Sequence, residues 1–499
     1  MTEAIDGLTA GSLTALILGP LILALVAVAL PRRRLIDSAV MLLALLLLAL
    51  LLPLSRAVLT HGPLVMDLGG HDAPIAIPLY VDSLALGMLW LLTLLALAIH
   101  PYASAWLQRS DHPHADDYPA LWLVLWTGLN SLVLSGDLFN LYVMLEVTTL
   151  GAVSLVMLGQ SAGAVSAAAR YLFFALVGSV LFLLGTALVY ADIGLLYMPM
   201  IAVHADASPA IVVALLAITA GVAMKAALFP LHAWLPIAHA SAPTPASAVL
   251  SAAVATAGVY LLLRLWLGPF AGTWTITTAQ GIGVIGAAGI LYGSAQALRQ
   301  QRIKVIVAYS TVAQLGYLLL LVPLAQSPLA WQGAVYHAVT HGLAKAGIFL
   351  AAGNLILAIG NDRLENLSGA DQFAAKNLLV IGIAGAAVAG LPPTGGFIAK
   401  WWLLSAALGQ GQWWWVAVIA VGSLLAAAYV FRILQYAMRQ PENRAEIDPR
   451  VRDQSLPYAL LWPPALLAAL ALGLGFSGEL LAPFLQVTDL SPALGGTGR

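Results

Sequence analysis

Residues 220–245 read AGVAMKAALFPLHAWLPIAHASAPTP, and this stretch decides the fold. Lys225 comes late in an apolar, helix-like run over residues 210–229, and a proline then breaks that run. A second stretch, residues 390–402 (GLPPTGGFIAKWW), places Lys400 after a similar break. A lysine inside a membrane span is costly and by default marks a path for ions or protons. Paired interrupted helices in two halves of a chain point to a transport site near the middle of the bilayer.

The overall composition is that of a membrane protein. Of the 499 residues, 61% are hydrophobic and 9% are charged, and the mean hydropathy is +0.93. A soluble domain would carry about 25% charged residues, so the composition predicts a polytopic helical membrane protein. The absence of cysteine excludes disulfides and cysteine-ligated clusters or metals. The net charge of −1 does not suggest a nucleic-acid partner, and no glycine-rich phosphate loop indicates a cofactor.

The apolar runs predict about fourteen membrane-spanning helices, since a helix needs about 20 apolar residues to cross a bilayer. The connections are short, and no segment could be a soluble domain. The predicted spans cover residues 11–30, 38–55, 81–100, 118–135, 137–158, 163–191, 210–229, 243–267, 278–297, 302–325, 330–359, 377–407, 413–438 and 457–483.

Basic residues in the loops set the expected orientation. The three arginines at residues 32–34 place the first loop in the cytoplasm, and most of the 21 lysines and arginines then fall on the same side. Arg56, Arg264 and Arg499 fall on the opposite side. This split predicts an even number of spans, with both termini on the outer face of a bacterial cytoplasmic membrane.

One carboxylate stands near the middle of a predicted span. Glu146 lies in DLFNLYVMLEVTTLGAVSLV, with apolar residues on both sides. Such a group either pairs with a basic residue for packing alone or exchanges protons, and the second interpretation is favoured because a buried charge is costly. Its candidate partners are Lys225 and Arg170. Arginine does not readily lose its proton, so the role expected of Arg170 is electrostatic.

Lysine, unlike arginine, can release its proton when burial and neighbouring charges change around it. Lys225 and a carboxylate that moves closer or further away would form a two-residue proton switch. Lys400 is expected to act in a similar way. The alternative is a lysine that reaches the membrane surface, and this is more plausible for Lys400 because tryptophans follow it.

A third cluster of titratable groups follows one predicted helix. His337, His341 and Lys345 are spaced i, i+4, i+8 and so share one helical face. A row of this kind suits a proton relay. Hydrogen bonding between helices and a metal pair are the alternatives. No acidic third ligand is adjacent, so no metal is expected.

Other polar groups could support a proton path. Tyr309 and Gln314 precede the histidine helix and could hold water molecules. His232 and His239 flank the first helix break, where they could take up protons or cap freed backbone groups. Asp82, at the start of the third span, could be a helix cap or a functional acid.

Together these motifs resemble the antiporter-like subunits of the complex I and Mrp superfamily, and most closely the D-type subunit of Mrp sodium/proton antiporters. The resemblance covers residues 80–440. Its motifs are Glu146 in the fifth span, K-x4-P-L-H-x-W-L-P (Lys225 to Pro236), A-P-T-P (Ala242 to Pro245), A-Y-S-x3-Q-x-G-Y (Ala308 to Tyr317), H-x3-H-x3-K (His337 to Lys345) and G-L-P-P-T-G-G-F-x2-K-W (Gly390 to Trp401).

The resemblance implies an all-α fold of fourteen helices with two inverted five-helix repeats, in which helices 7 and 12 are broken. The implied units are the first three helices (1–117), helices 4–8 (118–267), helices 9–13 (278–438), and a cytoplasmic loop with the last helix (439–499).

The resemblance also implies roles for the residues. Glu146 and Lys225 are similar to the glutamate–lysine pair of the first half-channel, and Lys400 to the terminal lysine of helix 12. The motif His337 to Lys345 resembles the polar relay of the second half. Many members carry a lysine in helix 8, and Thr256 occupies that place here. The two halves would therefore be linked through water, Thr256 or the histidine helix.

The implied function is proton translocation within a multi-subunit membrane complex. A Mrp-type antiporter would exchange protons for sodium or another monovalent cation, and its partners would be other integral membrane subunits. The alternatives are a proton-pumping subunit of a complex I-like quinone oxidoreductase or membrane-bound hydrogenase, and a free-standing secondary transporter. In none of these would the chain itself be the redox enzyme.

Overall fold

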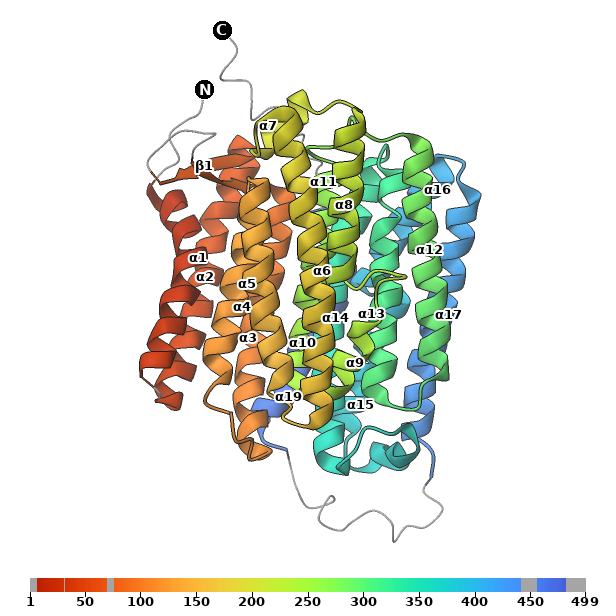
Figure 1. The fold of residues 1–499 in the computed structure, drawn as a ribbon. Helices are drawn as coiled ribbons and strands as arrows, with labels where there is room; N and C mark the ends of the chain where they lie inside the picture. The colour runs from red at the N-terminus through yellow and green to blue at the C-terminus, as the bar shows by residue number, and fades with distance from the viewer. Residues whose placement is uncertain (1–6, 31, 70–75, 441–455, 482–499) are drawn as a thin grey trace.

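The structure is a computed structural model, and it describes residues 7–30, 32–69, 76–440 and 456–481. Within these ranges the chain forms a bundle of helices with one short β-hairpin (Figure 1). Eleven helices are long and apolar enough to cross a membrane, and three shorter apolar helices raise the described total to the predicted fourteen. The prediction of an all-α polytopic membrane protein is confirmed.

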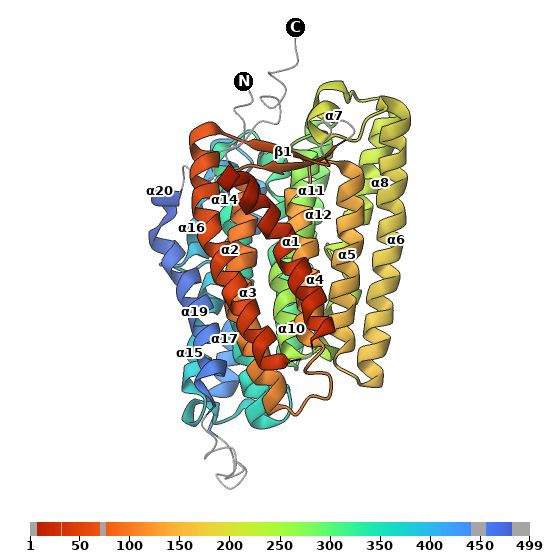
Figure 2. The same cartoon turned by 90° about the vertical axis from the view of Figure 1, so that its left-hand side faces the viewer.

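The N-terminal helices stand at one side of the bundle, where α1 packs against α2 and α4 (Figure 2). Asp82 caps α3, because its carboxylate accepts a hydrogen bond from Ala85 N at 2.9 Å. The hairpin before it is antiparallel, with Leu64 opposite Val81. The elements are α1 (Gly7–Ala29), α2 (Arg33–His61), β1 (Leu64–Leu68), β2 (Ile77–Val81) and α3 (Ser83–Arg109).

The next part of the chain corresponds to the first predicted repeat. Ser161 and Ser208 cap α6 and α8 through their side-chain oxygens, which is the usual signal for a helix start. The elements are α4 (Tyr118–Leu134), α5 (Leu138–Met157), α6 (Ala162–Ile193), α7 (Met198–His204), α8 (Pro209–Lys225), α9 (Trp234–Ser241), α10 (Thr244–Val249), the π-helical turn η1 (Leu250–Val254) and α11 (Ala255–Trp266).

The remaining described elements include the second predicted repeat. They are α12 (Ile276–Arg299), α13 (Ile303–Leu319), η2 (Val322–Leu324), α14 (Pro328–Ile359), η3 (Leu364–Leu367), η4 (Ala370–Gln372), α15 (Ala375–Ala389), α16 (Gly395–Gly409), α17 (Trp413–Ala437), α19 (Tyr458–Gly473), η5 (Leu474–Phe476) and α20 (Gly478–Leu481). The inverted relation between the two repeats stays a prediction.

Both predicted helix breaks are present, and the first begins before Pro230, the residue that predicted it. The predicted span 210–229 stops early, because α8 ends at Lys225 and Ala227 has a positive φ of 54°. The predicted span 377–407 is divided into α15 and α16 at Gly390, whose φ is 81°. The two lysines singled out in the sequence therefore lie at, or just beyond, the interruption of a helix.

Close approach of backbones requires glycine between α6 and α8. A Cβ on Gly221 would lie 2.4 Å from Gly178 O, and a Cβ on Gly178 would lie 2.7 Å from Gly221 O. Small residues at such crossings let membrane helices pack tightly. This contact holds α6 against the last turns of α8, where Lys225 lies.

Many charged side chains gather at the end of the bundle opposite the hairpin. Arg302 pairs with Asp362 at 2.8 Å, and Arg363 pairs with Glu365 at 3.1 Å. At the other end, α1 begins near the hairpin and α20 lies toward the same end (Figure 2). This arrangement agrees with an even number of crossings. Which end faces the cytoplasm stays a prediction.

Candidate functional site

The first broken helix presents Lys225 inside the protein. The chain leaves the helix after this residue, and Trp234 Nε1 donates to the freed carbonyl of Met224 at 2.8 Å. Leu228 N reaches back to Ala223 O at 2.9 Å. The break is therefore stabilised by internal hydrogen bonds, as backbone at membrane depth requires.

Lys225 lies against Glu146. Its Nζ is 3.0 Å from Glu146 Oε1 and 2.9 Å from Thr149 Oγ1. Ser179 on α6 donates to the same carboxylate oxygen. The Lys225 side chain is 6% exposed and that of Glu146 is 26% exposed. Lys225, one of the two suggested partners of Glu146, therefore contacts it. The ion pair joins a buried lysine to a half-buried carboxylate, and the hydroxyl groups of Thr149 and Ser179 also bond to it.

Arg170, the other suggested partner, lies elsewhere. Its side chain is exposed on α6. It precedes Ser179 by nine positions, which is about half a rotation around the helix and roughly 13 Å along its axis. Since Ser179 faces Glu146, Arg170 points away from it.

The histidine helix α14 carries its three titratable groups in the interior. Lys345 is 0% exposed, and His337 and His341 are 2% and 3% exposed. The two histidine rings are stacked with centroids 6.1 Å apart. His337 Nε2 lies 3.2 Å from Gln314 O. The predicted common face exists, and it points into the bundle.

Lys345 is held by α13 rather than by a carboxylate. Its Nζ donates to Val307 O and, at 2.5 Å, to Ser310 Oγ. It also lies 5.7 Å from the centroid of the Phe349 ring, on which the His239 ring stacks at 4.9 Å. His239 therefore approaches the Lys345 end of the histidine helix.

The second broken helix holds Lys400 by backbone carbonyls. Lys400 Nζ donates to Val388 O at 2.9 Å and to Ala389 O at 3.2 Å, which are freed carbonyls at the end of α15. The partial negative charge of a helix C-terminus favours a cation there. The Nζ also stands 4.2 Å from the Tyr317 ring centroid. Lys400 is 4% exposed, so it does not reach the membrane surface.

The middle of the molecule is bridged by hydroxyl groups. Ser251, in the π-helical turn η1, and Thr311 lie 2.7 Å apart. Thr311 and Ser310 both donate to Val307 O, at 3.1 Å and 2.8 Å. Val307 O also accepts from Lys345. A π-helical turn within an α-helix often marks a functional site.

Thr256, at the place of the missing lysine, is 0% exposed. Within the described residues its hydroxyl has no hydrogen-bond partner. Two residues further along, a Cβ on Gly258 would lie 2.6 Å from the Cβ of Ala226, the neighbour of Lys225. Thr256 is therefore near the first broken helix, and on the same span as Ser251.

The remaining predicted residues lie at the edge of this arrangement. His232 is 7% exposed and stands 6.3 Å from Tyr309 between ring centroids. Tyr309 itself is half-buried. Gln314 is buried and its Nε2 donates to Tyr429 at 3.3 Å. His232 and Tyr309 form an aromatic cluster with Phe229 and Tyr292 rather than contacting Lys345.

Several buried polar atoms near the histidine helix lack a protein partner in the part of the chain that the structure describes. Buried polar groups normally have a partner, and ordered water supplies it when protein does not. We therefore expect water along this face. The atoms are His239 Nδ1 and Nε2, Gln314 Oε1, His337 Nδ1, Thr340 Oγ1, and His341 Nδ1 and Nε2.

Sequence reasoning missed Thr149 and Ser179. Thr149 is three positions after Glu146, and residues three apart are neighbours on a helix, so its position was a usable signal. Nothing in the sequence connects Ser179 with Glu146. Among the described residues, no group of three or more His, Cys, Asp or Glu side chains could hold a metal.

The fold and this site define a class: a polytopic membrane protein whose broken helices hold lysine side chains inside the helix bundle. A family model described as NADH:quinone oxidoreductase/Mrp antiporter, TM, matches residues 135–426, and the chain belongs to this family. The predicted resemblance to the complex I and Mrp superfamily is confirmed.

Relatives come from both branches of the family. The N-type subunit of the NADH-quinone oxidoreductase of Desulforudis audaxviator is 37% identical over 84% of this chain and 86% of its own length. The D-type subunit of the Na(+)/H(+) antiporter of Bacillus subtilis is 27% identical over 87% of each chain.

Two solved structures share the fold over nearly the whole chain. A chain of the Mrp complex from Dietzia sp. DQ12-45-1b matches with a TM-score of 0.86 and 26% identity, covering 95% of this chain and 96% of its own. A chain of an archaeal respiratory complex, the membrane-bound sulfane sulfur reductase, matches with a TM-score of 0.84 and 26% identity, covering 96% and 98%.

Proposed function

We propose that this chain is the proton-translocating subunit of a multi-subunit membrane complex, and that the complex is a Mrp-type monovalent cation/proton antiporter. The contact between Lys225 and Glu146 at 3.0 Å, beside a broken helix, carries the proposal. Charges inside a membrane span are costly and mark ion pathways by default. The likeness to a D-type antiporter subunit and to a chain of a Mrp complex supports the antiporter branch.

In the first half of the path, Lys225 exchanges the proton. Glu146 controls how firmly the lysine holds it, because an adjacent carboxylate favours the charged form. Thr149 and Ser179 orient the two groups. When Lys225 gives its proton to water, it becomes a neutral amine that can accept another proton from the opposite side.

The link between the halves passes through the hydroxyl bridge rather than through a lysine in the eighth span. The bridge consists of Ser251, Thr311 and Ser310, and it ends at Lys345. Hydroxyl groups both donate and accept hydrogen bonds, but Thr311 and Ser310 meet only at the carbonyl of Val307, which accepts from both. The relay therefore needs water between these two hydroxyls as well as near Thr256. In this path Lys345 has the role that the resemblance assigns to a lysine in the eighth span, where this chain has Thr256.

In the second half, the proton follows His341 and His337 along α14 to Lys400. Each imidazole can accept a proton on one nitrogen and release one from the other. Lys400 is the terminal group, and the carbonyls of α15 stabilise its charged form. His239, Tyr309, Gln314 and His232 support the hydrated surroundings of this path.

The partners of the chain would be other integral membrane subunits, together with protons and sodium or another monovalent cation. We place the complex in a bacterial cytoplasmic membrane, with both termini on the outer face. The charged end of the bundle would then face the cytoplasm. Any redox chemistry in the complex would belong to other subunits.

A second function is favoured by one observation. The identity to the N-type subunit of a NADH-quinone oxidoreductase is 37% over 435 residues. On that basis the chain would be a proton-pumping membrane subunit of a redox-driven complex. The proton path would be the same, and only its driving force would differ.

Inverted vesicles that carry the whole complex distinguish the two functions. We expect added sodium to collapse an imposed pH gradient in wild-type vesicles, measured with a pH-sensitive dye. If sodium has no effect but a quinone-linked electron donor acidifies the vesicles, the redox-driven function replaces the antiporter. If neither sodium nor the electron donor changes the pH inside the vesicles, the proposed function is wrong.

The hydroxyl bridge gives a second expected result. Thr311→Val keeps the shape of the side chain but removes its hydroxyl, so proton-coupled transport should fall severalfold while assembly is unchanged. Thr186→Val is the matched control, because Thr186 is also buried and bonds a carbonyl four residues earlier, but lies away from the bridge. Equal transport rates in the two variants would show that the bridge carries no protons.

A further inference from the structure

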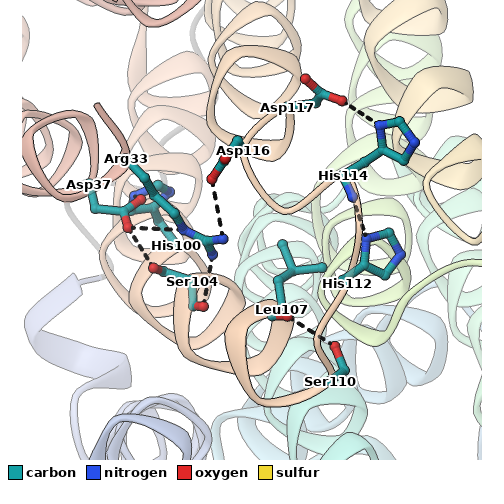
Figure 3. A network of polar contacts seen from close by, with 10 residues as sticks. All are labelled: Arg33, Asp37, His100, Ser104, Leu107, Ser110, His112, His114, Asp116 and Asp117. Atoms are coloured by element: carbon teal, nitrogen blue, oxygen red, sulfur yellow. Dashed lines mark hydrogen bonds and ion pairs between the residues drawn. The ribbon is translucent and has the colours of Figure 1, made fainter. Parts of the chain in front are cut away.

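A second cluster of charged groups lies outside the five-helix repeats, at the end of the bundle opposite the hairpin. It joins the start of α2, the end of α3 and the loop over residues 110–117 that leads to α4 (Figure 3). Its members are Arg33, Asp37, His100, Ser104 and Asp116. The proton path described above uses none of them.

His100 is the buried centre of this cluster. Its side chain is 1% exposed, and its Nε2 lies 3.1 Å from Asp37 Oδ1. The other carboxylate oxygen of Asp37 accepts a hydrogen bond from Ser104 at 2.5 Å. Asp37 is 19% exposed, so the pair is reachable by water although the imidazole is enclosed. Figure 3 shows Asp37 facing both His100 and Ser104.

Arg33 connects this pair to the loop. Its Nε lies 3.7 Å from Asp37 Oδ2, and its Nη1 lies 3.6 Å from Asp116 Oδ1. Its Nη2 donates to Ser104 O at 2.9 Å. The guanidinium is therefore shared between a carboxylate in the bundle and a carboxylate on the loop.

The charges of the cluster do not balance while His100 is neutral. Two carboxylates, Asp37 and Asp116, then face the single cation Arg33. One proton on His100 makes the cluster neutral.

Among the described residues, the neighbours of His100 on α4 and on the α14 side of α3 add no charge to the cluster. The Tyr118 ring of α4 stacks on the imidazole with centroids 6.2 Å apart. On the side of α3 that faces α14, Tyr102 donates to Leu350 O at 2.9 Å and carries no charge. Arg109, at the end of α3, is nine positions from His100 and so lies about half a rotation away.

We propose that Asp37 and His100 form a proton-binding site, separate from the Lys225 path, whose occupancy sets how firmly Arg33 holds the loop over residues 110–117. When His100 takes a proton, the new cation shares Asp37 and repels Arg33 toward Asp116, which closes the loop. When the proton leaves, Arg33 turns back to Asp37 and the loop is released. No bond other than N–H forms or breaks.

The loop over residues 110–117 also contains a histidine–aspartate pair at the surface, which can be compared with the pair of Asp37 and His100. His114 Nδ1 and Asp117 are closer to each other, at 2.7 Å, yet their side chains are 49% and 61% exposed. Surface pairs of this kind contribute little. Figure 3 shows this pair apart from the cluster around Arg33. It therefore distinguishes a buried proton site from an ordinary surface pair.

The absence of cysteine from the chain allows a direct test. A single cysteine introduced by Pro113→Cys, at an exposed position of the loop, would be labelled with a maleimide in the assembled complex over a range of pH. Labelling of the same cysteine in the denatured complex, at each pH, corrects for ionisation of the thiol itself. We expect slower labelling on the acid side in the wild-type background, and loss of this extra pH dependence with His100→Gln.

Two further variants make the outcome decisive. Asp37→Asn keeps the size of the side chain and should also abolish the extra pH dependence. This variant keeps the test possible if the His100→Gln complex does not assemble. His114→Gln should leave the extra pH dependence intact. The proposal is overturned if the extra pH dependence is absent from the wild-type background or survives in an assembled His100→Gln or Asp37→Asn complex. Labelling does not require transport, so this test is independent of the proposed function.

Discussion

Replacing Lys225 by alanine should reduce proton-coupled transport to the rate of vesicles that lack the complex. The lysine is the group that exchanges the proton in the first half of the path, and its Nζ contacts Glu146 at 3.0 Å and Thr149 at 2.9 Å. No other basic group of the described residues is paired with Glu146, so the path has no substitute. Transport in inverted vesicles, with assembly followed on a native gel, measures the effect.

Lys225→Arg separates proton transfer from charge pairing. Arginine keeps the positive charge beside Glu146 but does not lose its proton, so the complex should assemble and still fail to transport. Lys376→Ala is the matched control, because Lys376 is exposed at the start of α15. Normal transport by an assembled Lys225→Arg complex would show that the lysine only balances charge.

Replacing Arg264 by alanine should give the largest loss of stability. Arg264 forms two hydrogen bonds to the carboxylate of Asp82, at 2.5 and 2.6 Å, and both side chains are almost fully buried. Removing one partner of such a pair costs about 3–5 kcal/mol, because it takes the counter-ion away from a buried charge. The melting temperature of the purified complex should fall accordingly.

The double variant Asp82→Asn/Arg264→Met tests the reason for this loss. Asparagine can still cap α3 through Ala85 N, and methionine fills part of the space without a charge. Much of the lost stability should therefore return. If the double variant is as unstable as Arg264→Ala, the cause is lost packing rather than an uncompensated carboxylate.

The raised pKa of the Tyr80 phenol, caused by burial and then by Asp82, reflects the same enclosed surroundings.

Much of the fold could be predicted from local patterns in the sequence. Apolar runs predicted the eleven helices of membrane length and the three shorter apolar helices that the structure describes. Prolines and glycines predicted both helix breaks, because they cannot continue an α-helix without losing hydrogen bonds or favourable dihedral angles. The i, i+4, i+8 spacing placed His337, His341 and Lys345 on one face, as observed.

Contacts between distant segments could not be predicted in the same way. Glu146 had two basic candidates, and the choice between Lys225 and Arg170 depends on how α6 is rotated, which its nearly uniform apolar sequence does not reveal. The groups that bind the Lys400 ammonium are backbone carbonyls. Every residue carries a carbonyl, so no residue pattern could reveal these partners. Asp37 and His100 are 63 positions apart and match no motif, so their pairing became visible only in the structure.

The most direct test of the central claim uses proteoliposomes that contain the purified whole complex and an internal pH-sensitive dye. A sodium gradient should drive a change of internal pH in the wild type, and the assembled Lys225→Arg complex should show none. An equal pH change in the two complexes would contradict the claim that protons cross this chain through Lys225.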